Sequence, residues 1–160
     1  MINWFFSRWN WYAKPGVESN APKEINDAIL TAINVKLVEE VLYCPLLEKV
    51  IVLVDADNYF DAIGMGGRCV ELASAISGMR VQVLTAEDLE KMIEYALDAF
   101  EELPFVDDDI SNRLVGEGFL TYRELSYIDK QDLMLLSSFT RLQTNELLAT
   151  VKRFAEFDED

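Results

Sequence analysis

The residues VIVLVDADNYFDAIGMGGRCVELASAISGMRVQVL, numbered 50 to 84, decide the fold expected of this chain. The first five form a β-branched apolar run, which is too short for a helix and typical of a buried strand. A short helix is expected next, because Asp57 or Asn58 can cap its start and Ile63-Gly64 can end it. The stretch therefore opens as a buried strand followed closely by a helix.

A glycine loop and a second helix continue the same stretch. Residues 64–67 read GMGG, and apolar residues then recur at roughly helical spacing, at Val70, Leu72, Ala73 and Ile76. Ser77-Gly78 is expected to end this helix, and residues 80–84 (RVQVL) alternate as a half-buried strand. A GxxG loop lacks bulky Cβ atoms, and the N–H groups that open the next helix favour a phosphate, so a nucleic-acid backbone can approach closely. Strand, helix, GxxG, helix and strand is the layout of a KH domain.

A helix and a strand are expected ahead of this core. Residues 24–34 (EINDAILTAIN) place Ile25, Ala28, Ile29 and Ile33 on one helical face, and residues 36–44 read as a strand. This order matches the bacterial, type II form of the KH domain. The fold class predicted for the first part of the chain is thus α+β, with a three-stranded sheet and helices.

The second part of the chain reads as a small all-α module. Thr85 is expected to cap an amphipathic helix that Pro104 ends, and Asp107 to Asp109 to cap the next helix. Short helices with tight turns follow, in a helix-hairpin-helix arrangement. Its expected core is Leu114, Phe119, Leu125, Ile128, Leu133, Leu136, Leu142, Leu147 and Val151. The predicted domains are therefore residues 23–103 (KH domain with its connecting helix) and 104–160 (acidic helical repeat).

The N-terminal residues 1–22 are predicted to be an aromatic-rich segment followed by a linker. Residues 1–12, MINWFFSRWNWY, contain six aromatic side chains around Arg8. A membrane-interface helix and a docking peptide both fit this composition, and so does a segment that packs against its own domain or a second copy. No run of about eighteen apolar residues occurs, so no membrane-spanning helix is expected.

The charge of the chain limits its partners. The 160 residues include 29 acidic and 14 basic side chains, for a net charge of −15. A nucleic-acid-binding surface is normally basic, so any RNA binding is expected to be weak. The absence of histidine excludes Ser–His and Cys–His triads and imidazole-ligated metal sites. Cys44 and Cys69 are expected to be reduced thiols in the cytoplasm, and neither a metal nor a cofactor is expected.

The chain resembles the NusA family of bacterial transcription elongation and termination factors, over about residues 24–155. The resemblance rests on residues 62–64 (AIG), the GxxG loop, residues 70–74 (VELAS), residues 77–79 (SGM) and the "LV-EGF-T--EL-Y" pattern from Leu114. These correspond to the second KH domain and the acidic repeat of the family. The resemblance implies a non-enzymatic accessory role in transcription elongation, termination or antitermination.

The resemblance also implies two sets of site residues. Single-stranded RNA would bind weakly at Ile63, Gly64, Met65, Gly66, Gly67, Arg68 and Arg80. A protein would dock at Gly116, Glu117, Phe119, Glu124 and Tyr127, either the C-terminal domain of the RNA polymerase α subunit or another basic transcription-complex protein. The chain departs from the family where Met65, Gly66 and Glu71 stand in the places of basic residues. The resemblance covers no other domain of the family, so the chain is expected to correspond to the carboxy-terminal part of such a factor.

Three other interpretations compete with an RNA-binding role: a metal-dependent enzyme, a calcium loop and a protein-interaction component. Asp55-x-Asp57 at the end of a strand is also found in metal-dependent phosphatases and sugar-nucleotide transferases, but those enzymes need a long doubly wound sheet and further ligands. A calcium loop needs glycine where Phe60 stands and glutamate where Gly66 stands. No enzyme activity and no small-molecule substrate are therefore expected. The strongest alternative is a protein-interaction or assembly component that keeps a degenerate KH scaffold without binding RNA.

Overall fold

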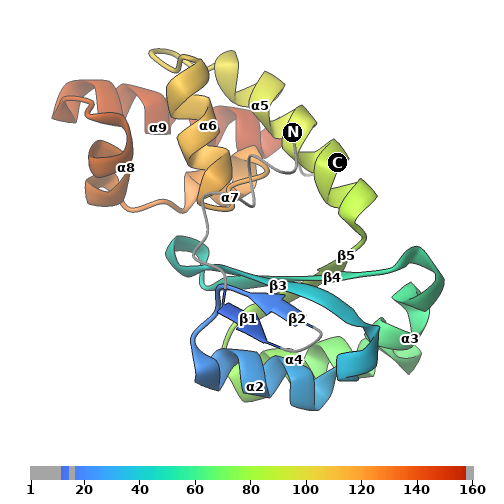
Figure 1. Ribbon diagram of the computed structural model, residues 1–160. Helices are drawn as coiled ribbons and strands as arrows, with labels where there is room; N and C mark the ends of the chain where they lie inside the picture. The colour runs from blue at the N-terminus through green and yellow to red at the C-terminus, as the bar shows by residue number, and fades with distance from the viewer. Residues whose placement is uncertain (1–11, 15–16, 158–160) are drawn as a thin grey trace. The chain divides into compact units, whose positions relative to one another are not determined.

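The computed structural model describes residues 12–14 and 17–157 (Figure 1). Most of the aromatic N-terminal segment and the last three acidic residues lie outside this range. The chain is α+β and divides into two compact units after Glu90, inside helix α5 (Ala86–Glu101). The sequence, in contrast, indicates a boundary near Pro104, where this helix has ended.

The first unit contains a mixed sheet whose strands follow the order β1-β2-β3-β4-β5. Strand β3 is antiparallel to β4, β4 is parallel to β5, β2 is parallel to β3, and β1 is antiparallel to β2. The strands span β1 Tyr12–Lys14, β2 Val17–Ser19, β3 Val38–Cys44, β4 Lys49–Val54 and β5 Arg80–Leu84. The three strands predicted from the sequence are confirmed as β3, β4 and β5.

The expected linker before residue 23 is partly strand, which corrects the sequence prediction. Strand β2 pairs with β3, and Asn20 extends this pairing with its side chain. The Asn20 Nδ2 donates to the Tyr43 carbonyl oxygen at 3.1 Å, and the Tyr43 N–H donates to Asn20 Oδ1 at 2.6 Å. Because β3 lies more than twenty residues further along the chain, the local sequence carries no signal for its pairing with β2.

The helices of the first unit lie close to their predicted positions. They span α2 Lys23–Ala32, α3 Tyr59–Ile63 and α4 Arg68–Ser77, with short 3₁₀ turns η1 Val35–Leu37, η2 Pro45–Leu47, η3 Ala56–Asn58 and η4 Met65–Gly67. Asn58, one of the two expected caps, is the N-cap residue of α3, although its side chain makes no capping hydrogen bond. Asp55, directly after β4, caps η3 instead. Its Oδ1 accepts a hydrogen bond from the Asp57 N–H at 3.0 Å, which closes η3 directly behind the strand.

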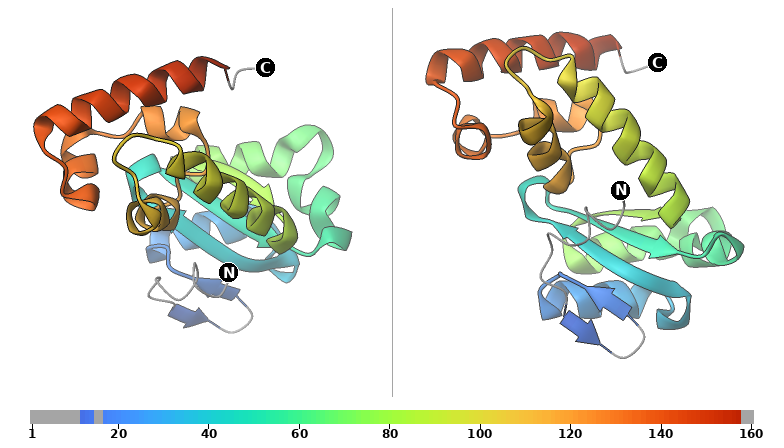
Figure 2. Two further views of the ribbon diagram at one scale, coloured as in Figure 1. Left: turned by 90° about the horizontal axis from the view of Figure 1, so that it is seen from above. Right: turned by 45° about the horizontal axis from the view of Figure 1, so that its top comes forward.

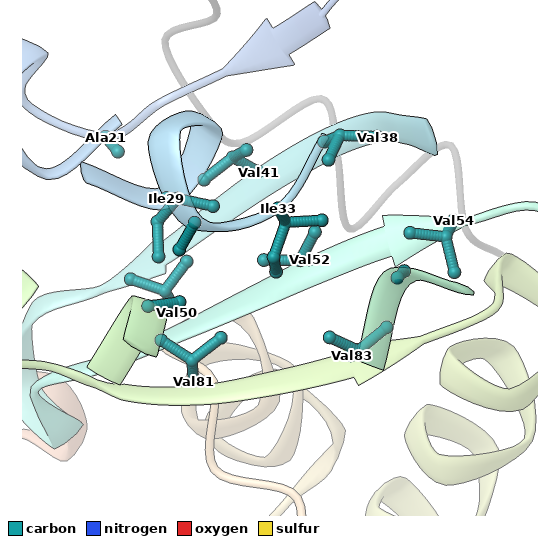
Figure 3. Packing of buried hydrophobic residues seen from close by; sticks show 13 residues of the cluster. Ala21, Ile29, Ile33, Val38, Val41, Val50, Val52, Val54, Val81 and Val83 are labelled. Atoms are coloured by element: carbon teal, nitrogen blue, oxygen red, sulfur yellow. The ribbon is translucent and has the colours of Figure 1, made fainter. Parts of the chain in front are cut away.

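The core of the first unit lies between the sheet and helices α2 and α4, which cover one sheet face (Figure 1). Alternate residues of β4 point to this face, as the period of a strand requires, and they meet Ile29 of α2 and Ile33, which directly follows this helix (Figure 3). The cluster comprises Ala21, Ile29, Ala32, Ile33, Val38, Val41, Val50, Val52, Val54, Ala62, Ala73, Val81 and Val83. Every residue of β4 is buried, as the apolar run predicts for residues 50–54, and Lys49 at the start of the strand is buried as well.

Helix α4 buries a narrower face than its apolar residues predict. Ala73 is fully buried, and Cys69 lies one turn before it on the same face. Leu72 and Ile76, which the sequence places on the apolar face, remain 46% and 49% exposed. Residues four apart share a helix face, so a face centred on Ala73 turns Leu72 and Ile76 toward its margins.

The second unit is helical beyond α5. Its helices span α6 Asp108–Gly116, α7 Tyr122–Ser126, α8 Lys130–Ser137 and α9 Arg141–Phe157. Helix α7 packs against α9, and α8 contacts both α6 and α9 (Figure 2). The Ser111 hydroxyl donates to the Leu97 carbonyl oxygen at 3.2 Å, and the Tyr122 hydroxyl donates to that of Ala99 at 2.5 Å. These bonds join the end of α5 to α6 and α7.

Most of the core predicted for the second unit is buried, and Leu142 is the clear exception. It is 77% exposed, whereas α9 buries Thr144, Leu147, Leu148 and Val151. That spacing describes one helix face, and a residue two positions before Thr144 points to the opposite side. Leu136 is half-buried, and the other seven predicted core residues are buried.

No helix within residues 12–14 and 17–157 is both long enough and apolar enough to cross a membrane.

Candidate nucleic-acid interface

A groove of about 450 Å³ lies between helices α3 and α4 and strand β5. A volume of this size falls within the range of about 300–1,000 Å³ that is usual for small-ligand sites. The lining is mainly apolar and consists of Tyr59, Ile63, Gly67, Val70, Glu71, Val81, Gln82, Val83 and Leu84. One end of the groove therefore reaches the GxxG loop, and one side follows strand β5.

The glycines of the GxxG loop have two different roles. Gly64, Gly66 and Gly67 all have positive φ angles, of 81°, 65° and 78°. A Cβ at Gly64 would lie 2.6 Å from Cys69 Sγ and 3.0 Å from the Cys69 backbone nitrogen, so this position must be glycine for the chain to pack. A Cβ at Gly66 or Gly67 would meet no heavy atom within 4 Å. These two glycines leave open space through which a ligand backbone can approach.

The loop leads directly into the N-terminus of α4, where Arg68 is the first residue. The N–H groups of a first helical turn have no partner within the helix and carry a partial positive charge, which favours an anion. Arg68 is exposed, but so are the nearby carboxylates Asp61 and Glu71. The site therefore has the geometry for a phosphate but little of the net positive charge that gives strong binding.

Strand β5 is the last strand of the described sheet, and four of its residues line the groove. The Val81 N–H donates to Ser74 Oγ at 3.3 Å, on the side away from β4, whereas the Arg80 N–H donates to the Glu48 carbonyl oxygen. Backbone groups alternate sides along a strand, so Val83 also directs its N–H and C=O away from β4. The groove thus combines apolar walls with a backbone donor and acceptor.

Two large apolar side chains near the groove are almost fully exposed. Phe60 is 82% exposed and Met65 is 92% exposed. The Phe60 ring makes an edge-to-face contact with the groove residue Tyr59, with ring centroids 5.5 Å apart. Sequence analysis did not identify Phe60 or Tyr59 as site residues. An aromatic residue in the helix before the loop was the available signal, since aromatic rings stack on nucleobases.

The predicted RNA-binding residues are only partly brought together. Ile63 and Gly67 line the groove, Gly66 and Met65 form the exposed tip of the loop, and Arg68 follows it. Gly64 is half-buried and serves the packing of the loop against Cys69. Arg80 is exposed at the start of β5 but does not line the groove. Sequence reasoning thus located the loop and missed the strand edge.

Most of the residues predicted to dock a protein are buried or form hydrogen bonds within the fold. Gly116 and Phe119 are buried, so neither offers a surface to a partner. Glu124 is half-buried, and its Oε1 accepts a hydrogen bond from the Leu120 N–H at 3.1 Å, which helps to cap α7. Glu117 is half-buried and Tyr127 is 74% exposed. Of the five, Tyr127 is the side chain best placed to meet another protein.

The DxD pair after β4 has a structural use in this fold. Asp55 caps η3 through its bond to the Asp57 N–H, and both side chains are exposed. Across the described part of the chain, no three His, Cys, Asp or Glu side chains gather in a group that could hold a metal ion. The geometry offers a groove beside an open glycine loop instead.

A comparison of the sequence with models of known protein families found no family that matches this chain.

Proposed function

We propose that the first unit is a type II KH-like module that binds single-stranded RNA weakly in the groove beside the GxxG loop. The observation that carries the proposal is the apolar groove of about 450 Å³ that meets two glycines with open space around them. Single-stranded RNA exposes bases that can enter an apolar groove, while its phosphates need a close backbone approach. Both requirements are met on one side of this unit.

A binding mode follows from this arrangement. A base would occupy the groove against Tyr59, Ile63 and Val70, with the backbone groups of Val83 along its edge. The RNA backbone would pass over Gly66 and Gly67 and place a phosphate near the start of α4. Few cations are available there, so affinity would come mainly from the base rather than from phosphates.

The second unit supports an additional docking role in the same proposal. We infer a helix-hairpin-helix acidic repeat of the NusA type, acting in transcription elongation, termination or antitermination in the bacterial cytoplasm. From Lys91 onward the chain has 16 acidic and 7 basic residues, which favours a basic partner. The C-terminal domain of the RNA polymerase α subunit, or another basic protein of the transcription complex, would fill this role.

A protein-only scaffold is the competing function, and the charges around the loop favour it. Glu71 lines the groove, and Asp61 is exposed in the preceding helix. A carboxylate in these places repels phosphate, so a module specialised for protein contacts would tolerate these residues easily. Under this alternative the groove would hold an apolar side chain of a partner protein.

The test is an RNA titration of the full chain with the loop altered. Wild type and the Gly66→Asp plus Gly67→Asp variant are titrated with fluorescein-labelled single-stranded RNA at low salt. The variant should lose binding, because it adds two charges and two Cβ atoms where the RNA backbone must approach. Single Gly67→Asp and Gly78→Asp variants form a matched pair. Gly78 also has a positive φ, of 72°, and open space, but it lies at the opposite end of α4.

Loss of binding in Gly67→Asp with normal binding in Gly78→Asp supports the RNA proposal. Equal binding by wild type and the double variant places RNA elsewhere or rejects RNA binding. Affinity purification of the full chain with identification of bound polymerase subunits and RNA then tests the transcription role. An NMR titration with the polymerase α subunit tests docking, and shifts around Tyr127 that weaken with salt support it.

A further inference from the structure

Glu71 adds a charged side chain to the groove, whereas a purely apolar groove would accept any base without preference. Of the nine described residues that line the groove, Glu71 alone carries a charge. It lies in the first turn of α4 and is exposed, so its carboxylate can turn toward a ligand. Acidic residues also stabilise a first helical turn, and that structural role alone would not discriminate among bases.

The chemistry of a carboxylate decides which bases it can recognise. An ionised carboxylate accepts hydrogen bonds and donates none. Cytosine, adenine and guanine carry exocyclic amino groups, which donate, and glutamate accepts from the cytosine N4 amino group in known modes of base recognition. Uracil has an N–H between two carbonyl oxygens, and these oxygens repel a carboxylate. A glutamate in the groove therefore favours amino-bearing bases and disfavours uracil.

The backbone of β5 adds no preference among bases of its own. Val83 directs a donor and an acceptor toward the groove, so it can pair with bases of either pattern and does not by itself exclude uracil. Discrimination among bases then depends on the side chain of Glu71.

We propose that Glu71 is the specificity-determining residue of the groove and selects bases that carry an amino group, such as cytosine and adenine, over uracil. This inference rests on the proposed RNA-binding function. The preference among bases comes from the side chain of Glu71 and not from the general negative charge around the groove. Asp61 contributes to that charge and is also exposed, but it does not line the groove.

The test compares three labelled heptamers, rC7, rA7 and rU7, in anisotropy titrations at low salt. Wild type should bind rC7 and rA7 about tenfold more tightly than rU7, the size expected for a good contact to a base edge. Glu71→Gln keeps the length of the side chain but adds a donor and removes the charge, so the ratio should fall to about twofold or less. Asp61→Asn is the matched control, and it should raise all three affinities alike and keep the wild-type ratio.

The outcomes separate the inference from the proposed function. A tenfold ratio that collapses only in Glu71→Gln supports the inference. Equal binding of the three heptamers by wild type, or a ratio unchanged in Glu71→Gln, overturns it while leaving RNA binding in the groove intact. Absence of binding, or binding that Gly67→Asp does not affect, overturns the proposed function and the inference together.

Discussion

Gly64 is the residue of the glycine loop at which a substitution disturbs the fold most. Its φ of 81° and ψ of 168° lie in a region that essentially only glycine adopts. A Cβ would also lie 2.6 Å from Cys69 Sγ. Gly66 and Gly67 differ, because their positive φ angles come with open space. The first glycine of GxxG therefore serves the fold, and the later two leave the approach to the loop open.

Gly64→Ala is predicted to destabilise the protein by at least about 2 kcal/mol, from backbone strain and the clash with Cys69. Urea denaturation of the full chain measures this change. Gly78→Ala is the control, because Gly78 has a φ of 72° but no heavy atom near the added Cβ. It should cost only about 1 kcal/mol. Equal losses in the two variants would contradict the structural role assigned to Gly64.

Glu101 is a second residue whose environment has a measurable consequence. A hydrogen bond to the Asp108 carboxyl raises the pKa of Glu101, and the negative charges of Asp108 and Asp98 raise it further. A raised pKa means that the folded protein binds this proton more tightly than the unfolded chain. The stabilisation is fully present below the ordinary glutamate pKa and is lost as the pH rises through the raised value.

Glu101→Gln is therefore predicted to be more stable than wild type at neutral pH, where it removes repulsion between carboxylates. The difference should shrink as the pH falls through the raised pKa of Glu101 and vanish once wild type is protonated there. Chemical denaturation of both proteins between about pH 4 and pH 7 measures it. Glu94→Gln, on the same helix, measures the general effect of losing one charge. A difference independent of pH would argue against the contact between Glu101 and Asp108.

At the scale of elements, polar helix caps account for several acidic residues of the second unit. Asp107 Oδ1 accepts from the Ile110 N–H at 2.9 Å, and Asp129 Oδ1 accepts from the Gln131 N–H at 2.8 Å. Thr140 and Gln143 form a reciprocal capping box at α9. Part of the acidity of this unit therefore stabilises helix starts, and the remaining carboxylates are available for solvent or a partner.

The orientation of α9 leads to a prediction about two leucines of the same helix. Leu147 is fully buried and Leu142 is 77% exposed. Leu147→Ala should cost about 2–4 kcal/mol, because it leaves a cavity in the core. Leu142→Ala should change stability by less than about 0.5 kcal/mol. Urea denaturation of both variants checks the assignment, and a large loss for Leu142→Ala would mean that this residue packs in a core after all.

At the scale of the whole molecule, the net charge of −15 affects how binding to RNA and to proteins depends on salt. Nucleic-acid binding by most proteins gains from the release of counterions as lysine and arginine neutralise phosphates. This chain has Arg68 beside the loop and carboxylates around it. RNA binding should therefore depend weakly on salt, whereas docking of a basic protein should depend on it strongly.

The RNA affinity is predicted to fall with salt with a log–log slope of about 1, as one or two phosphate contacts imply. Arg68→Ala should lower that slope by about 0.7, the share of one contact on a single strand. Anisotropy titrations at several salt concentrations give both slopes. Lys36→Ala, which removes an exposed cation outside the groove lining, is the control and should leave the slope unchanged. A slope of about 3 or more would reveal cations beyond Arg68 in the contact.

Local pattern was enough to predict the elements that are defined by short-range chemistry. The β-branched run of β4, the glycine that ends α3, and the Thr85 and Asp107 caps were all located correctly, since each depends on residues within a few positions. The GxxG loop was likewise visible from its letters. The β1 and β2 strands were missed, because β2 joins the sheet through a non-local pairing with β3, and β1 is held in turn by its pairing with β2.

The sequence by itself determined the order of the elements, the apolar strand at the centre, the glycine loop and the acidic charge. Only the tertiary structure decided which side chains share a surface, because that depends on residues far apart in the chain. It brought Tyr59 and Glu71 to the same groove as the edge of β5, and it buried Phe119 while exposing Leu142. Periodicity predicts that a helix has an apolar face, but the neighbours against which it packs determine which residues that face contains.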